Sequence, residues 1–240
     1  MNLRDKLLSP QKPRHQFHDR ESLAWLAAHR PARLPRWHLS VSARQAVASA
    51  RPWVKYDPAV FTSAAIRDGI HGFRHACRVA IHSVALAAEA GAGSEEKEAA
   101  MWAGLLHDCR RKNDNADPRH GLRAGEWLKG RKVLPRGVNH FESAIRFAIS
   151  VHADPYDKIV ALPRYEGFRE LTDILKTADA LDRFRFPRSD WWFDPRFIRL
   201  PANPAVLGFA FDLALLSERA FLEGAGNPGA VLAAWRELSS

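Results

Sequence analysis

The stretch of sequence that decides the fold is residues 71–108, which read HGFRHACRVAIHSVALAAEAGAGSEEKEAAMWAGLLHD. Its apolar residues recur at helical spacing, which predicts two helices, one over 71–90 and one over about 94–108. Gly91 suits the left-handed backbone conformation that often follows a helix. Ser94 is expected to cap the second helix, whose first turn contains two glutamates where negative charge is favoured.

The same helical periodicity extends over most of the chain. Alternating runs typical of strands are few, and glycines and prolines lie between the periodic segments rather than inside them. We therefore predict an all-α protein with no internal repeat and no domain linker. Further helices are expected at 21–30, 41–51, 59–68, 119–129, 139–152, 167–185, 205–222 and 228–238.

Composition and charge agree with a folded chain that has a basic N-terminal part. Hydrophobic residues make up 46% of the 240 residues and charged residues 26%, which excludes a wholly disordered protein. The net charge is +9, and residues 1–60 hold eleven basic and four acidic side chains, or +7. The other 180 residues carry 25 minus 23, or +2. We predict a basic helical N-terminal cap, residues 1–60, on a single compact helical domain, residues 61–240.

The two cysteines, Cys77 and Cys109, cannot form a disulfide framework for a chain of this size. The N-terminus has no apolar stretch that resembles a signal peptide. No apolar run reaches the roughly 18 residues that a membrane-spanning helix needs. These observations predict a cytoplasmic protein without a membrane partner, and they do not predict an oligomeric state.

Histidines and aspartates form the pattern that carries chemistry. His71 and His75 are four residues apart and share a helix face. His107 and Asp108 end an apolar helix, where adjacent side chains diverge by roughly 100° and approach one ion from two sides. Asp179 falls on or beside the buried face of its helix, where an unpaired carboxylate is costly, so it requires an arginine or a metal. Imidazoles with carboxylates are typical ligands of Zn, Mn, Fe or Ni.

The order of these residues resembles the HD-domain superfamily of metal-dependent phosphohydrolases. The first histidine, His75, is followed by Arg-Val three residues on, and two leucines precede the pair His107 and Asp108. The resemblance covers about residues 70–185 and implies that His75, His107, Asp108 and Asp179 are metal ligands. Many members read His-Asp-Ile-Gly-Lys at the pair, whereas this chain reads His-Asp-Cys-Arg-Arg-Lys. In this respect the chain is similar to small bacterial HD proteins of unassigned substrate.

Two more histidines, His120 and His152, lie between the pair and the last aspartate. In the HD subgroup that holds two metals, histidines at such positions bind the second ion, and Asp108 would bridge the two ions. The resemblance thus implies one or two divalent transition-metal ions, with Mn, Fe, Ni, Co and Zn all open.

The implied reaction is hydrolysis of a phosphomonoester or phosphodiester, on a small anionic and nucleotide-like substrate, by a metal-activated water. Charge on the transferred phosphoryl group needs neutralising by basic side chains. Arg183 lies four residues after Asp179, and Arg111 follows the His-Asp pair closely. We therefore expect Asp108, Arg111 and Arg183 to be the catalytic residues.

The same residues have plainer interpretations. Asp179 could form a buried salt bridge with Arg183 or Arg78 instead of binding metal. His71 either coordinates the metal as well, orients His75 or contacts substrate. The remaining histidines would then be core or helix-end residues.

Two other functions compete with hydrolysis. The HD superfamily also includes mixed-valent diiron oxygenases, whose ligand types are the same. A nucleic-acid-binding protein with an HD scaffold is the third interpretation, because the basic segment 1–60 contains Trp25, Trp37 and Trp53 among its arginines. The aromatic residues 191–193, Trp-Trp-Phe, either stack on a base as a lid or pack a loop onto the core.

Overall fold

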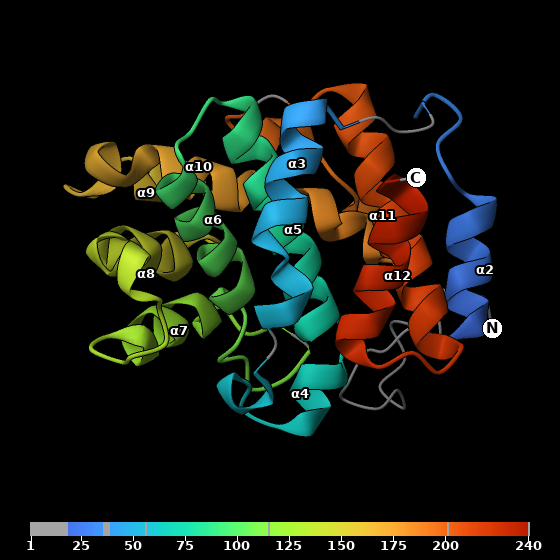
Figure 1. The fold of residues 1–240 in the computed structure, drawn as a ribbon, viewed down its shortest axis with the longest axis horizontal. Helices are drawn as coiled ribbons and strands as arrows, with labels where there is room; N and C mark the ends of the chain where they lie inside the picture. The colour runs from blue at the N-terminus through green and yellow to red at the C-terminus, as the bar shows by residue number, and fades with distance from the viewer. Residues whose placement is uncertain (1–18, 36–38, 56, 115, 201, 240) are drawn as a thin grey trace.

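The computed structural model describes residues 19–35, 39–55, 57–114, 116–200 and 202–239. Within these residues the secondary structure is helical and contains no β-strand, which confirms the all-α prediction (Figure 1). The described α-helices are α2 (Arg20–Ala28), α3 (Val41–Ala50), α4 (Ala64–Asp68), α5 (Phe73–Glu89), α6 (Ser94–Leu106), α7 (His120–Leu128), α8 (Glu142–Val151), α9 (Tyr156–Ile159), α10 (Tyr165–Leu181), α11 (Pro204–Leu222) and α12 (Asn227–Ser239). The 3-10 helices are η1 (Pro52–Lys55), η2 (Pro58–Val60), η3 (Arg136–Phe141), η4 (Asp182–Arg185), η5 (Ser189–Trp191) and η6 (Pro195–Phe197).

Helix α5 forms the centre of the molecule. It packs against α3, α6, α10 and α12, and nearly all of its side chains are buried. A helix that is covered on every side explains why its polar residues, His75 and Arg78 among them, must find partners inside the protein. In Figure 1, α6, α7 and α8 lie on one side of α5, and α11, α12 and α2 lie on the other.

Two glycines allow helices to approach closely at the places where histidines meet. A Cβ atom on Gly104 would lie 2.7 Å from the backbone of Ala80, so α6 can press against α5 only because that position has no side chain. A Cβ atom on Gly121 would lie 2.5 Å from the carbonyl oxygen of Ile149, and α7 meets α8 there. The first contact positions the end of α6, and the second positions the start of α7.

The N-terminal part of the described chain joins the same core. Arg30, just after α2, forms an ion pair of 2.9 Å with Asp212 of α11. Val47 and Trp53 belong to the main hydrophobic cluster, where the Trp53 ring lies 5.8 Å from that of Trp235. The boundary drawn at residue 60 stays a prediction, and residues 1–18 and Trp37 lie outside the described residues.

Most predicted helices are present, with differences that have local causes. The helix predicted over 59–68 is wrong in extent, because Ser63 caps a separate short helix through the backbone N–H of Ile66. Ser94 is the first helical residue rather than the cap, a position that Gly93 takes. Gly91 has a φ of 77°, as predicted. The short helix α9 was not predicted.

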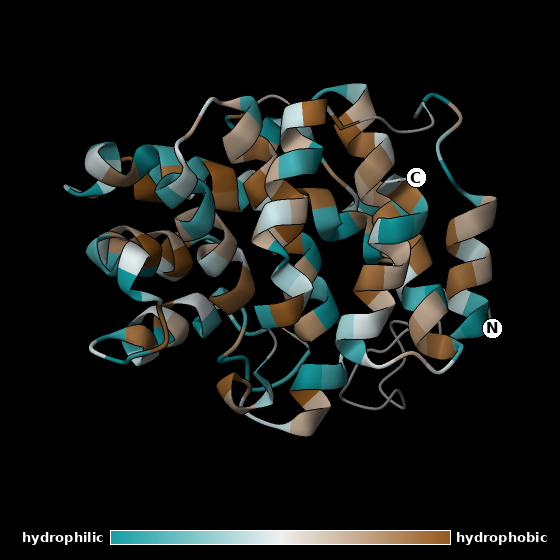
Figure 2. Ribbon diagram, in the orientation of Figure 1, coloured by the Kyte–Doolittle hydropathy of each residue, from teal (hydrophilic) through white to brown (hydrophobic). Residues whose placement is uncertain are grey.

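Hydropathy is mixed along the helices. Figure 2 shows hydrophilic and hydrophobic bands on the same helices, as amphipathic packing requires. Among the described residues, no helix combines the length and the apolar character needed to cross a membrane.

Candidate metal centre

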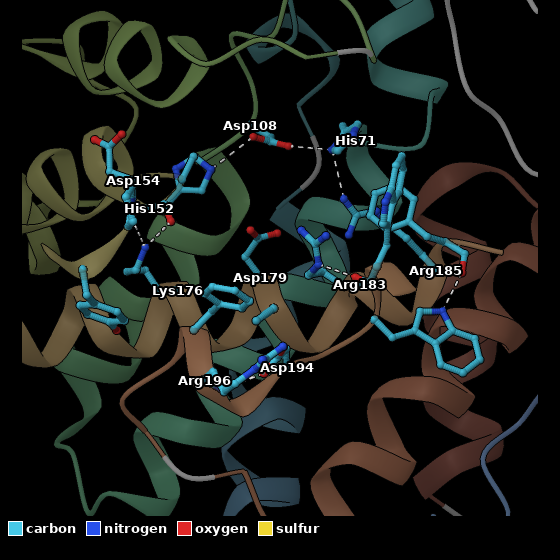
Figure 3. Close-up of a pocket in the computed structure, with 18 of the residues that line it drawn as sticks. His71, Asp108, His152, Asp154, Lys176, Asp179, Arg183, Arg185, Asp194 and Arg196 are labelled. Carbon is cyan, nitrogen blue, oxygen red and sulfur yellow. Dashed lines mark hydrogen bonds and ion pairs between the residues drawn. The ribbon is translucent and has the colours of Figure 1, made fainter. Parts of the chain in front are cut away.

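The six predicted ligands lie close together. Four of them, Asp108, His120, His152 and Asp179, line a cavity of about 680 Å³, and His75 and His107 contact Asp108 and Asp179 without lining it. Five of the six are buried, and the Asp179 side chain keeps 27% of its surface exposed. Figure 3 shows Asp179 and Arg183 projecting from α10 and η4 toward Asp108 on the opposite wall. The ligands come from five helices or their ends: His75 from α5, His107 and Asp108 from the end of α6, His120 from the start of α7, His152 from the end of α8, and Asp179 from α10.

The histidines meet in two pairs. The Nε2 atoms of His75 and His107 are 3.0 Å apart, and those of His120 and His152 are 2.9 Å apart. Asp179 belongs to the first pair, because its Oδ1 lies 3.4 Å from the His75 Nε2.

Asp108 lies between the two pairs. Its Oδ2 is 3.6 Å from the Nε2 of His75. Its Oδ1 is 2.9 Å from the Nε2 of His120 and 3.5 Å from that of His152. One carboxylate therefore offers one oxygen to each pair.

In each of these four histidines, the partner of the Nδ1 atom decides which ring nitrogen carries the proton. In every case Nδ1 faces an oxygen that only accepts, so Nδ1 carries the proton and Nε2 presents its lone pair to the site. The acceptors are the carbonyl oxygens of Gly104 for His107 (2.7 Å), of Ile149 for His152 (2.7 Å) and of Asp117 for His120, and the Asp182 carboxylate for His75 (2.7 Å).

This geometry fits a metal site. Two lone pairs facing each other at about 3 Å repel unless a cation lies between them. Two nitrogens bound at right angles to one ion, each at about 2.1 Å, are separated by about 3.0 Å. The Asp108 Oδ1 atom is buried and has no hydrogen-bond partner among the described residues. The buried histidines and aspartates are thus compatible with metal binding.

Protonation is disfavoured at His75 and His152, and it is favoured at His120. Burial, with Arg185 nearby, lowers the pKa of His75 to about 4. Burial also lowers the pKa of His152. For His120 burial acts in the same direction, but the Asp108 carboxylate outweighs it and raises the pKa.

Burial favours the neutral form of the two carboxyl groups of the site, Asp108 and Asp179. Nearby positive charge, on the histidines when they are protonated and on Arg111 and Arg185, lowers the pKa of both. The centre thus combines two carboxyl groups with four imidazoles, which is a ligand set for a divalent cation.

Both basic and acidic side chains line the cavity, and the acidic ones besides the predicted ligands are Asp154, Asp157, Asp190 and Asp194. Arg111 lies near the centre, with its Nη1 3.5 Å from the Asp108 Oδ2, and its catalytic role stays a prediction. Arg183 lines the cavity and donates its Nε–H to the Trp191 carbonyl oxygen at 2.6 Å. The sequence did not indicate Lys176, which lines the same cavity.

His71, whose role was left open, lies beside the ligands. Arg185 donates to its Nδ1 at 3.1 Å, and that nitrogen is also 3.2 Å from the Asp108 Oδ2. Because arginine only donates, the Nδ1 lone pair of His71 is already used. Sequence reasoning missed Arg185, whose partner His71 lies 114 residues away.

A buried ionic network behind the site was also missed. Arg78 is one of the two arginines that the sequence offers as a salt-bridge partner for Asp179. In the structure it binds Asp182 at 2.6 Å and Glu218 at 2.7 Å instead. One signal was available: Arg78 lies three residues after His75, and Asp182 lies three residues after Asp179. Equal spacings of this kind place both partners behind the ligands on facing helices.

The structure shows the packing role of the aromatic segment 191–193, and its role as a lid on a base stays a prediction. Trp192 packs onto the core, 5.7 Å from the Phe211 ring, and donates its Nε1–H to the Phe186 carbonyl oxygen. Trp191 and Phe197 line the cavity, and Phe197 is 68% exposed.

No protein-family model matches the chain, and neither a curated protein nor a solved structure shows significant similarity to it. Inference about function therefore rests on the residues of the site and on the physical chemistry of their arrangement.

Proposed function

We propose that this protein is a metal-dependent phosphohydrolase of the HD type that holds two divalent transition-metal ions. The observation that carries the proposal is the pairing of imidazole lone pairs at 3.0 and 2.9 Å on either side of one carboxylate. His75, His107 and Asp179 would hold one ion, and His120 and His152 the other. Asp108 would contribute one oxygen to each.

Bound divalent ions supply a water whose pKa is lowered to about 7 and positive charge for phosphoryl oxygens. The protein itself supplies the rest of the site. Arg111 and Arg183 face the cavity near the centre, where guanidinium groups stabilise charge on a phosphoryl group. The Trp191 carbonyl oxygen holds the Nε–H of Arg183, which fixes the direction of that guanidinium group.

The size and lining of the cavity support the proposal of a small anionic substrate. About 680 Å³ is the size of sites that enclose a whole small molecule rather than an ion alone. Arginine and lysine side chains line its walls, and the exposed Phe197 ring and Trp191 offer faces for a planar group. A nucleotide-like phosphomonoester or phosphodiester has both chemistries.

The test combines metal analysis with a phosphate-ester screen. The wild type is expected to contain close to two ions per chain and to release phosphate, and His107→Ala and Asp108→Ala are expected to lose both properties. Arg183→Gln should keep its metal but lose roughly 100-fold in turnover, as removal of a charge-stabilising donor does.

Arg169→Gln is the matched control, because Arg169 lies on α10 outside the cavity, where it is exposed and pairs with Glu166. A wild type that holds no metal, or variants as active as the wild type, would contradict the proposal. Iron content with oxygen consumption and no phosphate release would instead favour the oxygenase.

A further inference from the structure

His75 is anchored differently from the other three histidines of the centre. Their Nδ1–H groups donate to backbone carbonyl oxygens three residues earlier in the chain. His75 donates to a carboxylate, the Oδ2 of Asp182, at 2.7 Å. A carboxylate acceptor makes an imidazole more basic and orients its ring, which strengthens it as a ligand.

The position of Asp182 is fixed from its other side. The Asp182 side chain is fully buried, and Arg78 binds it with two hydrogen bonds, Nε to Oδ1 at 2.6 Å and Nη2 to Oδ2 at 3.0 Å. Such a fork defines the plane of the carboxylate as well as its location. Its Oδ2 accepts from Arg78, lies 2.7 Å from the Nδ1 of His75 and lies 3.6 Å from the Nη1 of Arg185.

Arg78 is itself held by helix α11 through Glu218, at 2.7 Å. Arg74 closes the network by donating to Glu218 at 2.9 Å and to Asn227 of α12 at 2.6 Å. Arg74, Arg78, Asp182 and Glu218 are all at most 2% exposed, and their formal charges cancel. A third arginine, Arg185, is 3% exposed and lies 3.6 Å from Asp182. Pairing of this kind avoids the cost of an unpaired buried charge.

The two halves of the centre differ in charge as well. The His75 half has Asp179 in addition to its share of Asp108, and the His120 half has only its share of Asp108. The half that contains His75 therefore has both the additional carboxylate, Asp179, and the imidazole that donates to a carboxylate, and both features strengthen cation binding there.

We propose that Asp182 is a positioning residue that makes His75 the strongest nitrogen ligand, so that the ion between His75, His107 and Asp179 binds more tightly than its neighbour. The inference rests on the proposed two-ion function and assigns an order to the loading of its ions. The second ion, at His120 and His152, is then the exchangeable one.

Asp182→Asn is the variant that separates these effects. Its amide has one accepting oxygen, and Arg78, which only donates, claims that oxygen. The amide NH2 group then faces the Nδ1 of His75, which must accept. The proton of His75 moves to Nε2, and the lone pair directed at the metal is lost.

Two measurements follow on the wild type and the variant. Nitrogen-15 NMR of the metal-free protein reports which nitrogen of His75 is protonated, and we expect Nδ1 in the wild type and Nε2 in Asp182→Asn. Calorimetric titration with Mn²⁺ alone is expected to show a tight and a weak step in the wild type. The variant should weaken the tight step about 10- to 100-fold and leave the weak step unchanged.

Glu218→Gln is the control, because it takes a charge from Arg78 on the side away from His75. We expect it to keep Nδ1 protonated and the tight step within about threefold. Equal weakening in both variants overturns the inference and shows a purely structural network. If Asp182→Asn does not fold, Nε2 protonation of His75 in the metal-free wild type overturns it. A wild type that binds no Mn²⁺ overturns the proposed function as well.

Discussion

His82 lies two turns after His75 on α5 and differs from it in its surroundings. It is 1% exposed, and neither ring nitrogen has a hydrogen-bond partner among the described residues. Burial lowers its pKa to about 4. A buried ring without partners costs stability at every pH at which the protein is folded.

We predict that His82→Leu stabilises the protein. At pH 7 the gain should be about 1 kcal/mol, because two unpaired polar atoms leave the core. From pH 6.5 down to 4, unfolded wild type binds a proton at this position and folded wild type does not, so its stability falls with pH. The gain in the free energy of unfolding at pH 5 should therefore exceed the gain at pH 7 by about 2 kcal/mol.

Urea unfolding of both proteins at the two pH values measures this difference. A variant that is less stable than the wild type at pH 5 would show that His82 has a favourable role that its contacts do not reveal.

The ligands and their anchors differ in how far sequence predicts them. His75, His107 and Asp179 were predicted because a residue type, its spacing and its helix face are all local properties. Asp182 and Glu218 were not identified as anchors, because which arginine binds which carboxylate depends on contacts across more than 100 residues.

At the scale of elements, the approach of α7 to α8 depends on Gly121. We predict that Gly121→Ala lowers the free energy of unfolding by about 1–2 kcal/mol, because its Cβ would lie 2.5 Å from the Ile149 carbonyl oxygen. It should also weaken the second Mn²⁺ step, since it separates His120 from His152. Thermal unfolding and Mn²⁺ titration provide the readouts.

Gly167→Ala is the matched control in α10, where a Cβ atom meets nothing within 4 Å. Its better helix propensity should raise stability by up to about 1 kcal/mol. If both substitutions stabilise the protein alike, close packing at Gly121 is not what positions His120.

Helix positions were largely predictable, because apolar residues recur at helical spacing in nearly every packed helix. The failures lie where the backbone changes course over a few residues. Ser63 begins a new helix inside a segment that reads as continuous, and α9 has only four residues, too few to show a period.

At the scale of the whole molecule, the N-terminal residues share the core of the C-terminal helices. Trp53 is 6% exposed and packs against Trp235 of α12. We predict that Trp53→Ala costs about 3–5 kcal/mol and shifts the complete unfolding transition, measured by far-ultraviolet circular dichroism. Val54→Ala, at a side chain that is 52% exposed, should change little.

A different result would support the division at residue 60. If Trp53→Ala splits unfolding into two transitions, the N-terminal segment unfolds separately from the rest. A single displaced transition shows one cooperative unit.

The ionic network behind His75 also sets an order of events during synthesis. His75 and His107 leave the ribosome early, but Arg78 meets Glu218 only after another 140 residues have been made. Until then, nothing from α11 holds the arginine that orients Asp182. On the proposed two-ion function, a nascent chain thus contains His75 well before the network that fixes its protonated ring nitrogen is complete, and we expect selective metal uptake to be a late step of maturation.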